Sequence, residues 1–148
     1  LQVDFMPDDD TLGFSNQWYK QALVTAENFQ LSDDTQIRLV SPVYFVATKL
    51  EAYKGRGNDD PLASRDMEDL LNIIDGRASL VSEIQQADKA LNSFIATEFS
   101  NLLSNSMFEY AVQSQSNGDN AREGILFQRI DLIVQNSAQG SAQNGTAE

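Results

Sequence analysis

The residues of this sequence whose types and spacing could support chemistry are cations and carboxylates. Lys49 and Arg56, in the stretch KLEAYKGR, are seven residues apart. Seven residues are about two turns of an α-helix, so a helix here places both cations on one face. Together they could grip a polyphosphate, the lysine as a point charge and the arginine as a fork. The same spacing also fits a solvated basic stripe with its stems along the helix, and spacing alone favours that interpretation.

Two carboxylates follow in the stretch SRDMEDLL. Asp66 and Asp69 are three residues apart, so in a helix they share one side of it. There they could orient Lys49 or bind a metal-bound nucleotide. A carboxylate in the first turn of a helix also stabilises the helix dipole and needs no further role. The pair by itself is therefore weak evidence for a site.

Other acidic residues are less informative. Asp4, in VDFMP, is a single carboxylate on an expected strand, whereas two-metal phosphoryl transfer needs several converging carboxylates. The acidic pairs and runs at 8–10, 33–34 and 59–60 are typical of solvated turns. The sequence contains no glycine-rich phosphate-binding motif.

Composition restricts the chemistry further. The 148 residues include no cysteine and no histidine, which excludes thiol catalysis, cysteine zinc sites and a serine triad. Any catalysis must therefore use carboxylates, lysine or arginine. The net charge of −12 disfavours sequence-independent binding to nucleic acid but leaves room for a small basic site. The sequence shows no membrane-spanning apolar run and no signal segment at its start.

The elements that must position these residues change character near residue 41. Residues 1–6 alternate apolar and polar, which predicts a strand. A short helix is expected over 16–23, and two strands are expected on either side of the turn SDD at 32–34. The predicted fold class is α+β: strands over 1–40, a mostly helical bundle over 41–136, and a disordered tail over 137–148.

The helical part carries clear start and stop signals. Ser41-Pro42 begins a helix that ends at Gly55 or Gly57. Ser64 begins the next helix, which ends at Gly76. We expect these two helices to pack antiparallel and to bring Lys49 close to Asp66. Their interface is expected from Met67, Leu70, Leu71 and Ile74.

Three further helices are predicted: one from about Asp88, one over 106–112, and one around 126–134, with residues 113–120 as a loop. The core residues expected on the first of them are Leu91, Phe94, Ile95, Phe99, Leu102 and Leu103.

Three segments, taken in order, resemble a known family. They are VDFMPDDDTLGFSNQWYKQAL, IRLVSPVYFVATKLEAYKGRG and LASRDMEDLLNIIDGR. They are similar to the second half of bacterial nucleotidyltransferase-fold proteins of the abortive-infection AbiEii toxin type. The resemblance is close over residues 1–80 and generic over 81–135. It implies a remnant of a mixed sheet followed by a helical bundle.

The resemblance also implies an activity and a set of roles. The complete protein would be a cytoplasmic toxin of a toxin–antitoxin pair, which uses Mg²⁺ to transfer NMP from an NTP to RNA or another hydroxyl acceptor. Asp4 would belong to the catalytic and metal-binding carboxylates. Lys49 would contact the nucleotide triphosphate with support from Arg56. Asp66 would hold Lys49, and Asp69 would help to fix the second helix beside the nucleotide.

Two departures from the family bear on activity. The Gly-Ser turn and the D-x-D pair of the family would precede Leu1, and many members of the family have His where this chain has Arg65. We therefore expect this chain alone to be inactive. The alternative is a non-catalytic helical interaction module or a gene remnant. If the chain belongs to a toxin, the resemblance implies a cognate antitoxin protein as a partner.

Overall fold

The computed structural model describes residues 16–142, the residues from 136 onward by their backbone alone. This part of the chain is α+β, as predicted, with seven helices and one two-stranded antiparallel sheet. The expected strand over residues 1–6 lies outside the described residues. The elements are α1 (Tyr19–Val24), β1 (Glu27–Ser32), β2 (Thr35–Leu39), α2 (Pro42–Arg56), α3 (Arg65–Gly76), α4 (Leu80–Gln85), α5 (Lys89–Leu103), α6 (Ser106–Ser116) and α7 (Asn120–Ala142).

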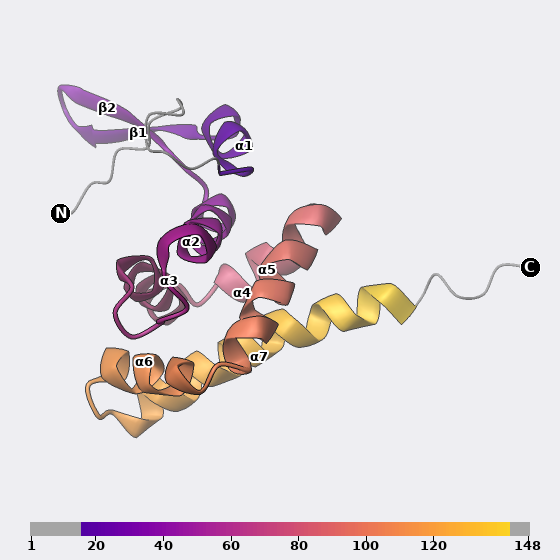
Figure 1. Cartoon of the computed structure of the whole chain (residues 1–148). Coiled ribbons are helices and arrows are strands. Elements are labelled where there is room, and N and C mark those ends of the chain that lie inside the picture. The colour runs from indigo at the N-terminus through magenta and orange to yellow at the C-terminus, as the bar shows by residue number, and fades with distance from the viewer. Residues whose placement is uncertain (1–15, 143–148) are drawn as a thin grey trace, which may run out of the picture.

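The two strands form the predicted hairpin. Phe29 pairs with Ile37 across the ladder, and the apolar residues of both strands share one face because directly opposed residues point the same way. The hairpin and α1 lie at one end of the molecule, beside α2 (Figure 1), and Trp18 at the start of α1 packs against Phe94 of α5. Every residue of β1 is exposed.

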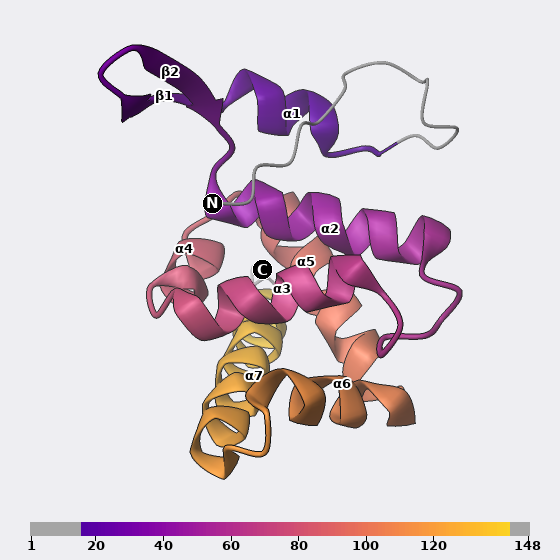
Figure 2. The same cartoon turned by 90° about the vertical axis from the view of Figure 1, so that its left-hand side faces the viewer.

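The α2–α3 pair is the part of the fold that positions the candidate site. Ser41 Oγ accepts from the Tyr44 amide and Ser64 Oγ accepts from the Met67 amide, both at 3.3 Å, which confirms the two predicted helix starts. Helix α2 ends against the cap residue Gly57. The two helices run side by side in opposite directions (Figure 2). The predicted interface stripe on α3 is buried, namely Met67, Leu70, Leu71 and Ile74.

Four features of the helical part differ from the prediction. Helix α4 occupies a stretch for which no element was expected, and it buries Leu80 and Ile84. Helix α6 continues to Ser116, so residues 113–116 are helical and not loop. Leu103, expected in the core, is 37% exposed. The last helix also extends further than expected: α7 runs to Ala142, through residues 137–142 of the predicted tail.

The core of the helical part is assembled around α7, which packs against α3, α4, α5 and α6. Among the described side chains of α7, those of Leu126, Ile130 and Ile133 are fully buried. This layer supports α3 from the side opposite to α2, so α3 is held between the two. Asp66 and Asp69 therefore project from a helix that is fixed on two sides.

Candidate functional site

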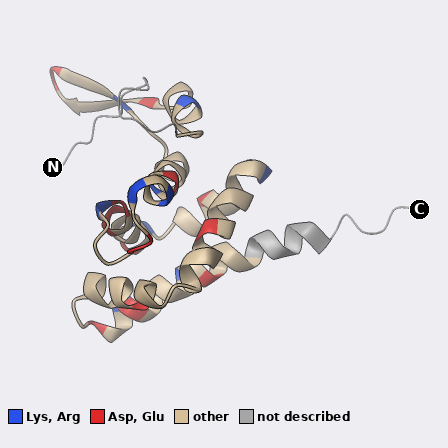
Figure 3. Ribbon diagram, in the orientation of Figure 1, with Lys and Arg blue, Asp and Glu red and all other residues tan. Residues whose placement is uncertain are grey.

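Four of the five predicted site residues meet where α2 packs against α3. Lys49 Nζ lies 2.7 Å from Asp69 Oδ2 and 3.4 Å from Asp66 Oδ1. Arg56 binds both oxygens of Asp66, with Nε 2.8 Å from Oδ2 and Nη2 2.9 Å from Oδ1. We call these four residues the α2–α3 ion cluster. Figure 3 shows acidic and basic positions next to each other where the two helices meet.

The exposure of these side chains bears on the two interpretations of the Lys49–Arg56 spacing, a phosphate-binding pair and a solvated basic stripe. The Lys49 side chain is 18% exposed and that of Asp66 only 5%, whereas that of Arg56 is 53% exposed. Lys49 is therefore not part of a freely solvated stripe: its ammonium is enclosed between carboxylates, and it lies 5.6 Å from the centre of the Phe45 ring. Arg56 closes the solvent side of the cluster.

The ion pairs within the cluster differ from those that the resemblance implies. Asp66 was expected to hold Lys49, and the two are in contact. However, Arg56 takes both oxygens of Asp66 in a bidentate pair, and the shorter bond of Lys49 goes to Asp69. Asp66 therefore contacts both cations, and Asp69 is a direct partner of Lys49 as well as a residue of the second helix.

The electrostatics keep the cluster ionised. Burial acts to raise the pKa of Asp66, but the hydrogen bonds and the charges of Arg56 and Lys49 outweigh it, so this pKa lies below its ordinary value of 3.8. The hydrogen bond to Asp66 likewise raises the pKa of Arg56. Ion pairing with Arg56 and Lys49 thus favours the ionised form of Asp66.

The described residues of the cluster do not form a Mg²⁺ site by themselves. The oxygens of Asp66 and Asp69 are bound by Arg56 and Lys49, and no group of three or more metal-ligating side chains occurs in the part of the chain that the structure describes. Asp4, the predicted metal ligand and catalytic carboxylate, lies outside the described residues.

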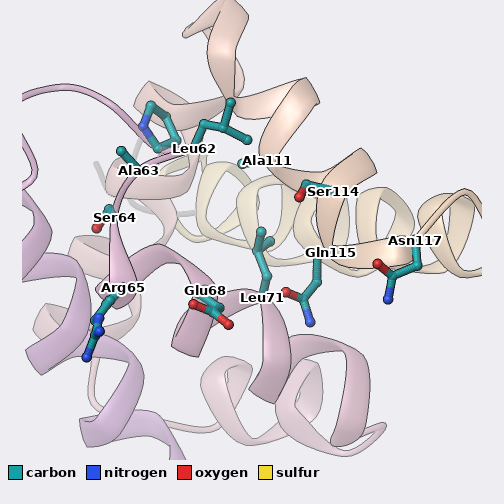
Figure 4. Close-up of a pocket in the computed structure, with 11 residues that line it drawn as sticks. Leu62, Ala63, Ser64, Arg65, Glu68, Leu71, Ala111, Ser114, Gln115 and Asn117 are labelled. Atoms are coloured by element: carbon teal, nitrogen blue, oxygen red, sulfur yellow. The ribbon is translucent and has the colours of Figure 1, made fainter.

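Arg65 is the position at which the sequence departs from the family that it resembles. It is exposed and lies at the edge of a cavity of about 410 Å³ between the start of α3 and α6, together with Glu68. Leu71 and Ala111 form its floor, and Figure 4 shows the polar side chains of α6 opposite the start of α3. The sequence reasoning did not find this cavity.

A second feature that the sequence reasoning missed is Tyr53, one turn after Lys49 on α2. Its side chain is buried and its hydroxyl has no hydrogen-bond partner. A tyrosine on an otherwise aliphatic helix face was the available signal, but a buried tyrosine usually finds a partner.

Comparisons of the sequence with known families and curated proteins, and of the fold with solved structures, give no match. Among the described helices, none combines the length and the apolar character that crossing a bilayer requires.

Proposed function

We propose that this chain is part of a Mg²⁺-dependent nucleotidyltransferase of the AbiEii toxin type, and that the α2–α3 ion cluster contacts the triphosphate of the NTP. The observation that carries the proposal is the position of Lys49, held between Asp66 and Asp69 on the facing helix. The resemblance implies contact between Lys49 and Asp66, and the structure has these two side chains within 3.4 Å of each other.

The cluster suits phosphate binding because its cations are held in place before a ligand arrives. Transfer of a phosphoryl or nucleotidyl group depends mainly on positioning and on neutralising charge, and it needs neither histidine nor cysteine. Arg56 presents a half-exposed guanidinium, and Lys49 presents an ammonium whose position two carboxylates fix. A phosphate would compete with Asp69 for Lys49, since both are anionic acceptors.

The hairpin supports the larger fold that this proposal requires. Phe29 and Leu39 are 48% and 50% exposed on the apolar face of the sheet. A two-stranded hairpin is marginally stable by itself, so its edges and its apolar face together favour additional strands or another packing partner. Those strands would carry the remaining carboxylates of the family, and together with Asp4 they would hold Mg²⁺. An RNA or other hydroxyl acceptor, a cognate antitoxin and a cytoplasmic location belong to the same proposal.

A non-catalytic interaction module is the second candidate. The same exposed face of the hairpin favours it, because a partner protein could cover that face as well as further strands could. In that case the ion cluster would serve only to join α2 to α3. The two candidates differ in what Lys49 does.

The test is nucleotide transfer from each labelled NTP in Mg²⁺, with RNA and protein acceptors. The 148-residue chain should bind NTP weakly or undetectably and transfer no label. A protein that also carries the Gly-Ser and D-x-D segment should transfer label, and it should lose this activity in Asp4→Ala and Lys49→Ala. Lys54→Ala is the matched control, because Lys54 lies on the same helix and pairs with Glu98 on α5.

Two outcomes would contradict the proposal. Label transfer by the 148-residue chain that Lys49→Ala abolishes would show that no further segment is needed. Activity of the longer protein that survives both substitutions would show that the family assignment is wrong.

A further inference from the structure

The turn between α6 and α7 contains Asn117-Gly118, the only Asn-Gly pair among the described residues. Both residues are exposed. Asn117 caps the end of α6 in a left-handed conformation, with φ 52° and ψ 37°, and Gly118 follows with φ +78°. Figure 4 shows the Asn117 side chain at this end of α6. Asparagine suits the cap because it tolerates the left-handed conformation, but it also places a side-chain amide directly before a glycine.

Few hydrogen bonds hold this turn closed. The Asn117 amide donates to the Ser114 carbonyl at 3.3 Å, and the Asp119 amide donates to the Ser116 carbonyl at 3.0 Å. No described residue accepts a hydrogen bond from the Gly118 amide. A Cβ atom added at Gly118 would meet nothing within 4 Å. The turn can therefore open locally while the helices on either side stay packed.

An open turn of this kind permits a reaction within the chain. The main-chain nitrogen of Gly118 can attack the side-chain carbonyl carbon of Asn117 and close a five-membered ring, so no second molecule has to be positioned. Glycine is the most favourable residue for this attack, because it has no side chain to shield the nitrogen or to restrict the backbone. The ring needs a ψ at Asn117 different from the 37° of the folded turn, so opening must come first.

We propose that Asn117 is a site of spontaneous deamidation, with water as the co-reactant. The Gly118 nitrogen gives up its proton and bonds to Cγ of Asn117, the Cγ–Nδ2 bond breaks, and Nδ2 leaves with that proton as ammonia. Water then adds to one of the two carbonyl carbons of the succinimide ring and opens it. Opening at Cγ gives aspartate, and opening at the main-chain carbonyl carbon gives isoaspartate. Nothing is oxidised or reduced.

The modification changes the turn in two ways. Either product places a negative charge at the C-terminal end of α6, where the helix dipole is already negative, and only two residues before Asp119. The Asp119 carboxylate accepts from the amides of Ala121 and Arg122 at the start of α7. Isoaspartate also routes the main chain through the side chain, which adds one carbon atom to the connection between α6 and α7. None of these residues belongs to the α2–α3 ion cluster, so this proposal does not depend on the nucleotide function.

The experiment is incubation of the full chain in mildly alkaline buffer, with peptide mass spectrometry at intervals. Asn58 is the matched control, because it is also exposed and left-handed, with φ 50°, but is followed by Asp59. We expect Asn117 to convert at least about tenfold faster than Asn58, and fragment spectra to show both isoaspartate and aspartate at residue 117. Equal rates at the two asparagines, or aspartate without isoaspartate, would overturn the proposal.

Two variants test whether ring closure causes the loss of ammonia. Asn117→Gln keeps an amide but must close a six-membered ring, so ammonia loss at residue 117 should fall by about tenfold or more. Asn58→Gln makes the same change in the other turn and should leave conversion of Asn117 unchanged. Thermal unfolding by circular dichroism verifies that both variants are folded. Undiminished ammonia loss at residue 117 in Asn117→Gln would overturn the proposal.

Discussion

At the scale of single residues, Asp66 is the group on which the α2–α3 ion cluster depends. Its side chain is 5% exposed, and a carboxylate that deep is tolerated only when cations and hydrogen bonds replace water. Arg56 and Lys49 supply both. Because both cations contact Asp66, its removal leaves Lys49 with Asp69 alone among its partners in the cluster and deprives Arg56 of its bidentate pair.

Asp66→Asn should therefore lower the free energy of unfolding near pH 7 by about 2–3 kcal/mol. The pKa of Asp66 is lower in the folded chain than its ordinary value of 3.8, so its ionised form stabilises the fold above that value. This stability is lost as the pH falls through the folded pKa. Urea unfolding at a series of pH values should show the difference between variant and parent shrinking below about pH 4.

The exposed turn residue Asp33 provides the control for this prediction. Asp33→Asn should change the free energy of unfolding by less than about 0.5 kcal/mol at any of these pH values. A penalty for Asp66→Asn that stays the same from neutral to acidic pH would mean that the loss comes from packing and not from the charge.

At the scale of elements, the two glycines near the end of α2 differ in whether there is space for an added Cβ atom. Gly55 lies inside the helix, is exposed, and has nothing within 4 Å of an added Cβ. Gly57 has an ordinary backbone conformation, with φ −75°, but an added Cβ would meet the Tyr53 ring at 2.3–2.5 Å. The need for glycine at residue 57 is therefore a need for space, and residue 55 has no such need.

Gly55→Ala should raise the free energy of unfolding by about 0.5–1 kcal/mol, because alanine loses less backbone entropy in a helix. Gly57→Ala should lower it by about 1–3 kcal/mol, because the fixed Tyr53 ring must move. Denaturant unfolding of the two variants makes a matched comparison, since each adds one methyl group to the same end of the same helix. Equal effects of the same sign would contradict the geometry described for Tyr53.

The sequence was sufficient to predict where some helices begin, but it did not predict every helix or every helix end. Ser41 and Ser64 marked the starts of α2 and α3 because a capping hydroxyl is a local signal. Helix α4 was missed because six residues are too few to show a period. The ends of α6 and α7 were missed because their last turns are rich in small and polar residues, and no apolar periodicity remains to follow.

The candidate site likewise contains contacts that could be predicted from the sequence and others that could not. The approach of Lys49 to Asp66 could be predicted, because two antiparallel helices joined by a short connection bring these positions together. The bidentate pair of Arg56 with Asp66 and the bond of Lys49 to Asp69 were not predicted, because they depend on how the side chains pack. The cavity of about 260 Å³ that Tyr53 lines, between the end of α2 and α5, could not be predicted. It depends on Asn58 and Asp59 both having left-handed backbone conformations, and on α5 residues more than 40 positions away. Contacts of that range come from tertiary packing, which leaves no local pattern.

At the scale of the whole molecule, the hairpin contributes little to the stability of the helical part. Its apolar face is about half exposed, whereas the helical core buries its large side chains completely. Phe29→Thr keeps a residue that favours strands, so it should change the free energy of unfolding by less than about 1 kcal/mol. Ile130→Ala, in the core, should cost about 2–5 kcal/mol.

The same Phe29→Thr substitution should reduce self-association at high concentration, since it removes a large apolar group from an uncovered face. Sedimentation velocity measures this, and denaturant unfolding of both variants measures stability. A cost of Phe29→Thr that equals the cost of Ile130→Ala would show that the hairpin is part of the core.

The position of α7 has a consequence for the chain during its synthesis. Helices α3, α4, α5 and α6 all leave the ribosome before the helix against which they pack. Before Leu126, Ile130 and Ile133 emerge, α3, α4 and α5 can pack against α2, but the faces of α3, α4, α5 and α6 that contact α7 have no partner, so the nascent chain cannot complete its core. A stop codon before residue 126 would release a product that exposes those faces, and such a product is a substrate for chaperones and proteases.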